Sequence, residues 1–479
     1  MNRLDAIVNW FSPGSGLKRY QARKHLESLR QIEAAGHGGR FENWKTYQTS
    51  PRDGNAGSLD IVRQRVRYLS QNNAYCSRAL KALTGYIVNT GIVPHATVKG
   101  GKAKKDEILR EWADHPYCDP AGRKNLYAIQ QLAVRTLIRD GEVIIKRVFS
   151  DDKSLPLPLQ IEVLEADHLD TATHDRVLKN GNQIIQGIEF DKRGRRVAYH
   201  LFDEHPSSAG IRSLKSKRYD AADIIHLFRE DRAGQVRGLS WFTPIVVRLK
   251  DFDDYEDSQL TRQKVSSLFV GVYKSLNPND PKKDMDIQTG ELKPGSFMVA
   301  PFGYEMQWSN PPQVEGFGEY AFHQKLTLGI GTEVPFMLLS GDYSKCNFSS
   351  SRMAMLNFFR FIEPVQQLEI IPQLCFPVQN WVDNACSLIG INEKCKYNWQ
   401  APVRDMVDPF KEMKAKEIKV ANGFDSHAST LREFGIDPYE FYEEQQRLQE
   451  YFDENGLKFP CDPRVHVAKA IGDKHENNN

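Results

Sequence analysis

The stretch RAGQVRGLSWFTPIVVRLKDFDDYEDSQLTRQKVSSLFVGVY, residues 232–273, decides the fold of this chain. Its apolar side chains recur at the three- and four-residue spacing of one helix face: Phe242, Ile245, Val246, Leu249, Phe252 and Tyr255, then Val265, Leu268 and Phe269. We therefore predict one long helix that Gly238 and Ser240 open. Unbroken from Ser240 to Val272, it would span about 33 residues and about 50 Å, which exceeds one small domain.

Acidic residues crowd the middle of this predicted helix: Asp251, Asp253, Asp254, Glu256 and Asp257. Such a density of charge predicts that the helix leaves a packed body and enters water or an electronegative space. A solvated, charged helix face is the simpler interpretation of the spacing by itself.

The composition limits the class of protein. At 479 residues, 40% of them hydrophobic, the chain can form two to four domains with separate cores. The 64 Lys and Arg residues nearly balance the 62 Asp and Glu residues, which argues against a protein that coats nucleic acid by charge alone. The N-terminus is a poor secretory signal and no apolar run reaches ~18 residues, so we expect a soluble protein made in the cytoplasm, without membrane contact.

The seven cysteines are odd in number and include no C-x-x-C pair. This pattern favours free thiols in a reducing compartment over a disulfide framework or a zinc site.

Residues 59–235 predict an α+β body, preceded by a flexible arm over residues 1–58. Apolar periodicity predicts helices over 59–69, 79–86, 106–113 and 126–139, and Gly141 then changes the period from 3.6 to 2. Strands are predicted over 142–148, 160–164, 183–190, 196–202 and 223–228. A hairpin turn at 191–194 and the lack of intervening helices indicate an antiparallel sheet.

After the long helix, residues 273–316 predict a small β excursion with strands at 296–300 and 304–308. A helix over 317–328 then returns. A loop over 340–352 leads into an apolar helix in which we expect a kink or break near Phe361, because Pro364 cannot supply its N–H.

The C-terminal third is predicted to be helical. Asp408-Pro409, Ser426 or Asp425, and Asp437-Pro438 are start signals, and Gly423 and Gly435 are stop signals. A disordered tail is expected over 467–479.

No catalytic motif stands out, and we expect no cofactor and no catalytic residue. Glu165, Asp167 and His168, with Asp170 close by, form a compact group that could bind a metal and serve a nuclease or hydrolase. The group lies at a strand end, where turn and capping roles are commoner.

Several blocks of the sequence, in order, resemble the lambda-type portal proteins of tailed bacteriophages. They are LDIVRQRVRYLSQNNAYCSRALKALTGYIVNTGI (59–92), EADHL (165–169), AGQVRGLSWFTPIVVRLKDFDDYEDSQLTRQKVSSLF (233–269), LKPG (292–295), GDYSKCNFSSSR (341–352) and VDPFKEMKAKEIKVANGF (407–424). The resemblance extends from about Tyr20 to about Tyr439.

The resemblance implies a subunit of the portal type. Its expected parts are an α+β wing (59–235), a stem helix (236–272), a β clip (273–316), a returning stem helix (317–339), a tunnel loop and kinked tunnel helix with wing (340–385) and a helical crown (386–466). It also implies a ring, usually of twelve copies, at one vertex of the virion capsid. Double-stranded DNA would pass through its channel. Expected partners are the terminase large subunit, major capsid and scaffold proteins, and head-completion proteins, with assembly in the host cytoplasm.

Within this family interpretation, the candidates for DNA contact lie in the tunnel loop: Asp342, Tyr343, Ser344, Lys345, Asn347 and Arg352. Lys345 is the best of them for a transient contact with phosphate. The acids of the long helix would repel phosphate if they line the channel. If they face outward or a neighbouring subunit, they serve solubility or an interface, and the sequence leaves both open.

Two other hypotheses remain at this point. One is the metal-dependent nuclease or hydrolase built on Glu165, Asp167 and His168. The other is a monomeric helical scaffold that binds proteins without closing a ring.

Overall fold

The computed structural model describes residues 50–52, 57–98, 101–102, 104–174, 176–209, 215–267, 271–275, 304–308, 316–344, 346–404, 406 and 408–457. The predictions for the N-terminal arm, the strand over 296–300, Lys345 and the C-terminal tail lie outside these ranges. The chain divides into two units, Met1–Gly54 and Asn55–Asn479, and the second contains every element described below.

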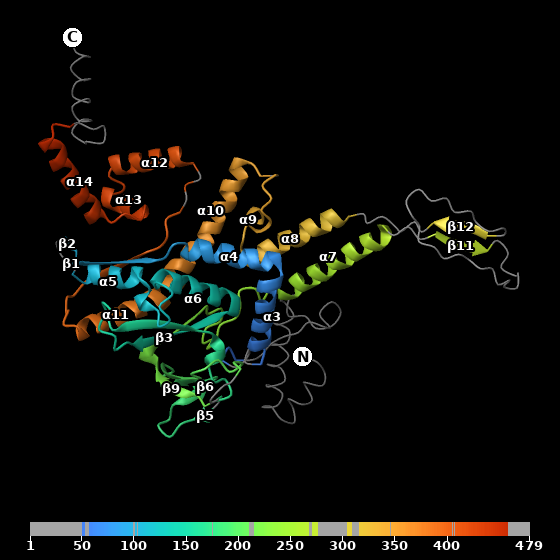
Figure 1. Ribbon diagram of the computed structural model, residues 1–479, viewed down its shortest axis with the longest axis horizontal. Helices are drawn as coiled ribbons and strands as arrows, with labels where there is room; N and C mark the ends of the chain where they lie inside the picture. Colours follow the sequence, from blue (N-terminus) through green and yellow to red (C-terminus); the bar gives the residue numbers. More distant parts are fainter. Residues whose placement is uncertain are drawn as a thin grey trace, which may run out of the picture. The chain divides into compact units, whose positions relative to one another are not determined.

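The core forms where helices cover one face of a three-stranded antiparallel sheet (Figure 1). The sheet has the order β10-β3-β4, with β10 at Ile224–Phe228, β3 at Glu142–Phe149 and β4 at Leu159–Leu164. Helix α6 (Leu126–Asp140) packs on this sheet, and α4 (Ala74–Val88) packs on α6. The strands predicted over 142–148, 160–164 and 223–228 and the helix predicted over 126–139 are confirmed.

Gly141 connects α6 to β3 in a left-handed conformation, with φ of +90°. A Cβ atom at this position would lie 2.2 Å from the backbone carbon of Leu239, so only glycine lets the two segments approach. The change of period at Gly141 thus marks a real junction of helix and strand.

A second sheet of five antiparallel strands runs in sequence order. Its members are β5 (Arg176–Val177), β6 (Gln183–Ile185), β7 (Ile188–Phe190), β8 (Arg196–Leu201) and β9 (Lys217–Asp220). The predicted single strand over 183–190 is wrong, because Gln186 and Gly187, at φ of +50° and +80°, form a tight turn that divides it into β6 and β7. The hairpin turn at 191–194 between β7 and β8 is confirmed.

Asn73 separates the first two helices of this unit, α3 (Leu59–Asn72) and α4. Its extended backbone ends α3, and its side chain accepts a hydrogen bond from the Cys76 N–H at 2.9 Å as the N-cap of α4. The boundary between the helices predicted over 59–69 and 79–86 is therefore a helix cap at Asn73.

Two long helices lie side by side, α7 (Val246–Ser267) and α8 (Phe317–Thr332) (Figure 1). Tyr255, in the middle of α7, contacts the rings of Phe317 and Tyr320 at the start of α8. Ile245, directly before α7, lies against Gly331 near the end of α8. The pair is therefore antiparallel. A Cβ atom at Gly331 would come within 2.2 Å of the Ile245 side chain, so this glycine permits the close approach.

The prediction of one unbroken helix over 240–272 is wrong at both ends. At the start, Pro244 offers no N–H, and the Trp241 N–H is bonded instead to the Ile138 carbonyl at 3.2 Å. Two tight turns therefore precede α7. At the far end, strand β11 (Gly271–Ser275) pairs with β12 (Tyr304–Trp308), so residue 272 is in a sheet.

Helix α10 (Phe348–Pro364) continues through a π-helical segment (Val365–Cys375) into α11 (Phe376–Leu388). Of the predicted kink or break near Phe361, the break does not occur, since Pro364 keeps a helical backbone at φ of −58° and ψ of −38°. The irregularity that the proline imposes takes the form of the wider π pattern that begins directly after it.

The C-terminal helices are α12 (Pro409–Ala421), α13 (His427–Glu433) and α14 (Pro438–Glu454). Asp408, Ser426 and Asp437 cap them through their side chains, as the start signals predicted. Strand β13 (Lys396–Gln400), which precedes them, pairs with β1 (Val93–Val98) of the N-terminal half.

The remaining elements are β2 (Gly101–Lys102), α5 (Lys104–Asp114), α9 (Phe336–Ser340) and short 3₁₀ turns at Pro116–Cys118, Ala166–His168 and Ala221–Asp223. No helix in the described part of the chain is both long and apolar enough to cross a membrane. The six cysteines within the described ranges are free, and burial raises the pKa of the Cys76 thiol to about 12.

Candidate functional site

The loop between α9 and α10 carries most of the predicted DNA contacts. The Asp342 carboxylate accepts the Ser344 N–H at 2.9 Å. Asn347 and Ser350 form a capping box, in which the Asn347 side chain accepts the Ser350 N–H at 2.8 Å. The polar side chains of Asp342 and Asn347 therefore hold the backbone of the loop and the first turn of α10.

Asp342, Tyr343, Ser344 and Asn347 are all exposed in this loop, and Tyr343 is 55% exposed. Arg352 belongs to α10, not to the loop, and is half-buried. Lys345 lies outside the described residues.

The acids of α7 divide into two groups. Asp251, Asp254 and Asp257 are spaced by three residues and exposed, and Asp254 pairs with Lys250. Asp253 and Glu256 are half-buried on another side of the helix.

The inner pair makes contacts with neighbouring helices. Asp253 accepts a hydrogen bond from the Asn73 side chain at 2.8 Å, which ties α7 to the start of α4. Burial raises the pKa of Glu256, and Lys325 of α8 opposes that shift. Only the outer three acids are thus available to a channel or a partner.

The acid and histidine group of the α+β body contains His205 in place of the predicted His168. Glu165, Asp167 and His205 offer atoms within 4.8 Å of one another, whereas the His168 ring bonds to the Phe202 carbonyl at 2.9 Å. An Arg67 nitrogen lies 2.6 Å from Asp167 and 3.1 Å from Glu165.

Arginines therefore occupy the place that a metal ion would need. Arg139 adds a contact of 2.7 Å to Glu165. Although burial opposes the shift, Arg67 and Arg63 hold the pKa of Asp167 below its ordinary value. The arrangement is that of a structural ion-pair network rather than a vacant cation site.

A second network, which the sequence did not reveal, surrounds the fully buried Glu142. Its carboxylate is bound by Arg237 through two nitrogens, by Arg63 at 2.9 Å and by His226 at 3.0 Å. Despite burial, Arg237 and His226 hold the pKa of Glu142 well below its ordinary value. The one signal in the sequence was a charged residue directly before the apolar run over residues 143–145 of β3.

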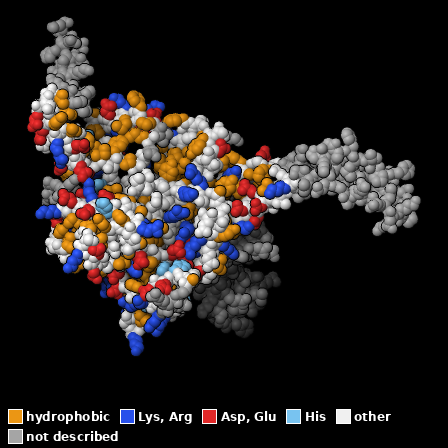
Figure 2. Space-filling model, in the orientation of Figure 1, with side chains coloured by type: hydrophobic (Ala, Val, Ile, Leu, Met, Phe, Trp, Pro, Cys, Tyr) orange, Lys and Arg blue, Asp and Glu red, His pale blue; other side chains and the backbone are white. Residues whose placement is uncertain are grey.

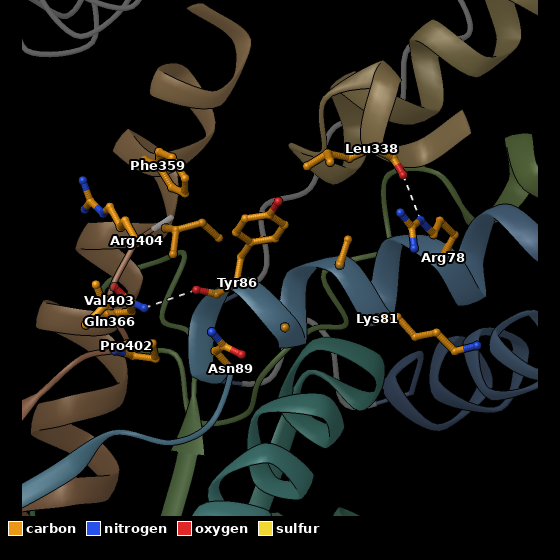
Figure 3. A pocket seen from close by; sticks show the side chains of 13 residues that line it. Arg78, Lys81, Tyr86, Asn89, Leu338, Phe359, Gln366, Pro402, Val403 and Arg404 are labelled. Atoms are coloured by element: carbon orange, nitrogen blue, oxygen red, sulfur yellow. Dashed lines mark hydrogen bonds between the residues drawn. The ribbon is translucent and has the colours of Figure 1, made fainter. Parts of the chain in front are cut away.

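A pocket of about 300 Å³ opens between α4, α9, α10 and residues 402–404 (Figure 3). We call it the α4–α10 pocket. Its lining combines polar and apolar side chains in about equal measure, and the apolar ones include Tyr86, Phe359 and Ile362. Gln366 is 5% exposed and donates to the Ile87 carbonyl at 2.8 Å.

Three cationic side chains stand around this pocket: Arg78, Lys81 and Arg404. Arg78 donates to the Leu338 carbonyl at 2.9 Å, and Arg404 lies over the Phe359 ring while pairing with Glu363 at 2.8 Å. Asn89, at one edge, has φ of +45°, an uncommon conformation for a residue with a side chain. Chemically, the pocket suits an apolar group that carries negative charge.

Helix α4 connects the predicted sites. Its N-cap contacts Asp253 of α7, and Arg78 contacts Leu338, two residues before the loop segment begins. The sequence predicted neither contact, since each joins residues more than 150 positions apart and leaves no periodic trace.

Comparisons with known proteins agree on one family. The sequence profile described as "Phage portal protein, lambda family" matches residues 37–366. The chain is 25% identical over 429 residues, 81% of each chain, to the "Probable portal protein" of Halomonas phage phiHAP-1. It is 18% identical over 481 residues, 86% of this chain and 88% of the other, to the "Portal protein" of Escherichia phage N15.

Among solved structures, the chain is similar to chains from three gene transfer agent (GTA) particles. The neck of a native particle with C12 symmetry gives a TM-score of 0.48 at 15% identity, covering 78% of this chain and 94% of that chain. The neck of an empty particle with C6 symmetry gives 0.49 at 16% identity, covering 80% and 94%. The virion of a native particle gives 0.48 at 14% identity, covering 86% and 99%. With TM-scores below 0.5, these likenesses carry no weight on assembly.

Proposed function

The chain belongs to the lambda family of phage portal proteins, and on this premise we propose that it forms a homo-oligomeric ring at one vertex of the virion capsid. Double-stranded DNA passes through the channel of the ring during packaging and ejection. The observation that carries the proposal is the family match over residues 37–366, which spans the α+β body, both long helices and the loop before α10.

The antiparallel pair α7 and α8 forms the stem of the proposed subunit, and β11 with β12 belongs to its clip. The exposed acids Asp251, Asp254 and Asp257 face the channel, where repetition around the ring repels phosphate. A conduit needs this property because each tight contact with phosphate adds binding free energy that moving DNA must overcome.

The loop between α9 and α10 touches the passing DNA. Tyr343 and Ser344 supply exposed polar atoms, and Lys345, outside the described residues, supplies the positive charge. One lysine per subunit gives weak, exchangeable contacts rather than a lasting grip.

The protein acts without catalysis and serves as a docking platform. In the host cytoplasm it assembles with scaffold and major capsid proteins, and the terminase large subunit and later the head-completion proteins bind to it. A metal-dependent nuclease is the poorer hypothesis, because Arg67 and Arg139 already neutralise Glu165 and Asp167.

Electron microscopy of the purified protein in negative stain, with its mass in solution, tests the ring. We expect particles with a central hole and a mass of about a dozen times the 54.8 kDa subunit. A protein that stays monomeric at every concentration, and also when expressed with its scaffold and capsid proteins, contradicts the proposal.

The loop contact is tested by Lys345→Ala in packaging. We expect normal rings and a reduced amount of packaged or retained DNA. The matched control is Lys411→Ala, an exposed lysine of α12. Normal genome content in Lys345→Ala particles removes this residue from the DNA path.

A further inference from the structure

A second hollow lies beside the α4–α10 pocket. It has a volume of about 690 Å³ and lies between α10 and the C-terminal helices α12 and α13. The two hollows adjoin, because both are lined by Phe359, Pro402, Val403 and Arg404. We call the combined feature the cationic groove.

The groove joins an apolar floor to positive edges. Met355, Leu356 and Phe359 of α10 line the floor, and Leu356 is 46% exposed. Figure 2 shows hydrophobic side chains gathered on this face along α10 and α12. An exposed apolar surface of this kind marks a site where another molecule binds.

Positive charge exceeds negative charge along the groove. Six cationic side chains line it: Arg78, Lys81, Arg352, Arg404, Lys416 and Arg432. Three acids oppose them, Glu363, Glu412 and Glu433, which leaves three positive charges in excess. Glu363 and Glu433 are already paired, with Arg404 at 2.8 Å and Lys416 at 2.6 Å. The ligand that fits is acidic and partly apolar.

Helix α14 has this chemistry on its outward side. Its sequence PYEFYEEQQRLQEYFDE contains six acidic residues and one basic residue, a net charge of five negative. Glu444, Leu448 and Tyr451 follow one another at helical spacing, and Leu448 and Tyr451 are 38% and 56% exposed. An acidic face therefore contains an apolar pair.

In its own chain, α14 is fixed at its start to α5. Arg110 contacts Asp437 at 3.3 Å and Glu440 at 2.5 Å, and Asp437 also caps the helix. These contacts lie at the opposite end from Leu448 and Tyr451. Leu448 and Tyr451 are exposed in the described part of the chain, where another subunit can reach them.

We propose that the cationic groove of one subunit binds α14 of the neighbouring copy of the same chain. The inference rests on the proposed ring and names the surfaces that join its subunits. Leu448 and Tyr451 enter the apolar floor while the glutamates meet the cationic edges, as in other complexes of an amphipathic helix with a groove. Because the groove and the helix are different surfaces, the contact runs head to tail and closes into a ring.

Charge exchange between two variants tests this contact. The helix variant is Glu443→Lys with Glu444→Lys, and the groove variant is Lys81→Glu with Arg432→Glu, all at exposed positions. We expect each variant alone to need a concentration at least about tenfold higher than wild type to form rings, because like charges then face each other.

An equal mixture of the two variants is the decisive sample. When the two variants alternate around the ring, the altered helix of one variant meets the altered groove of the other. The native helix of the groove variant then meets the native groove of the helix variant. We therefore expect rings of wild-type mass at wild-type concentration. The matched control, Glu107→Lys with Glu111→Lys on the exposed side of α5, has the same change of charge and should assemble as wild type.

The possible results separate the two proposals. Variants that form rings as well as wild type, or a mixture that fails to restore assembly, overturn the contact between α14 and the groove while the ring stands. A wild-type protein that forms no ring under any of the conditions above overturns the proposed function and this contact together.

Discussion

At the scale of single residues, Glu142 has the largest structural consequence. This carboxylate is fully buried and neutralises Arg63 and Arg237, which come from α3 and from the segment before α7. It therefore joins the α+β body to the start of the long helix. A buried ion pair contributes little to stability when intact, but removing one partner leaves the other charge without compensation.

We expect Glu142→Gln to lower the free energy of unfolding by about 3–5 kcal/mol, because the two buried guanidinium groups lose their counter-charge. Urea unfolding followed by circular dichroism measures the change. The matched control is Glu162→Gln, whose partner Lys146 is near the surface, and which should cost about 0.5 kcal/mol or less. Equal effects of the two substitutions would show that Glu142 has no special role.

His226, beside Glu142, makes stability depend on pH. Burial lowers its pKa from 6.5 to about 4, so the folded chain keeps this ring neutral where the unfolded chain protonates it. Between pH 6.5 and about 4, the unfolded state binds more protons than the folded state. The stabilisation that the neutral His226 ring provides is therefore complete above pH 6.5 and is lost as the pH falls to about 4.

We expect the urea midpoint to fall across that pH interval in wild type and to fall less in His226→Gln, whose side chain does not titrate. The pKa of Glu142 is held well below 4.5, so the stabilisation that its carboxylate provides is lost only at lower pH. Its titration is therefore separate from that of His226. A wild-type midpoint that is constant between pH 6.5 and 4 would contradict the prediction.

At the scale of secondary structure, caps and glycines decide where the helices end. Asn73, Asn347 and Asp437 each begin a helix by accepting a backbone N–H. Gly141 allows two backbones to approach, and Gly331 admits the Ile245 side chain. These are local signals, and two of them, Gly141 and Asp437, were identified from the sequence. The π-helical segment after Pro364 was not, because how a helix accommodates a proline depends on the packing of the residues around it.

Asn347→Ala should loosen the first turn of α10, because the capping box loses the side chain that accepts the Ser350 N–H. A loss of about 1 kcal/mol predicts about fivefold faster amide hydrogen exchange at residues 349–351. Asn357→Ala, an exposed change within the same helix, is the control and should leave exchange in this turn unaltered. Unchanged exchange in both variants would mean that the cap does not hold the loop.

At the scale of the whole molecule, a near balance of charge suits a conduit. The formal net charge is +2, and the unbalanced charges are local, with exposed acids on α7 and α14 and cations along the groove. In a ring, each local excess is repeated by symmetry. The weak electrostatic effect of each charged side chain is then summed over all subunits into a strong electrostatic field along the channel and at the interfaces.

Neutralising Asp251, Asp254 and Asp257 with asparagine raises the formal net charge from +2 to +5 per subunit, since three negative charges are lost. We expect rings of normal mass that bind double-stranded DNA more tightly at low salt, with a steeper dependence on salt concentration, and that package it more slowly. The control replaces Glu107, Glu111 and Asp151, three exposed acids of the α+β body, by their amides. DNA affinity that rises equally in both variants would place the α7 acids outside the channel.

The amino-acid sequence by itself determined the α+β class, the family, most helix boundaries and the two antiparallel helices, because periodicity, caps and glycines act over a few residues. It also indicated Tyr343 and all five acids of α7 as candidates, without separating the exposed acids from the half-buried ones.

Only the tertiary structure decided which polar residues are already engaged. Arg67 fills the predicted metal cluster, Asp253 binds Asn73, and the groove gathers cations from α4, α10, α12 and α13. Each of these contacts joins segments that are distant in the chain. Such contacts depend on how the elements pack in three dimensions, and no local pattern in the sequence encodes them.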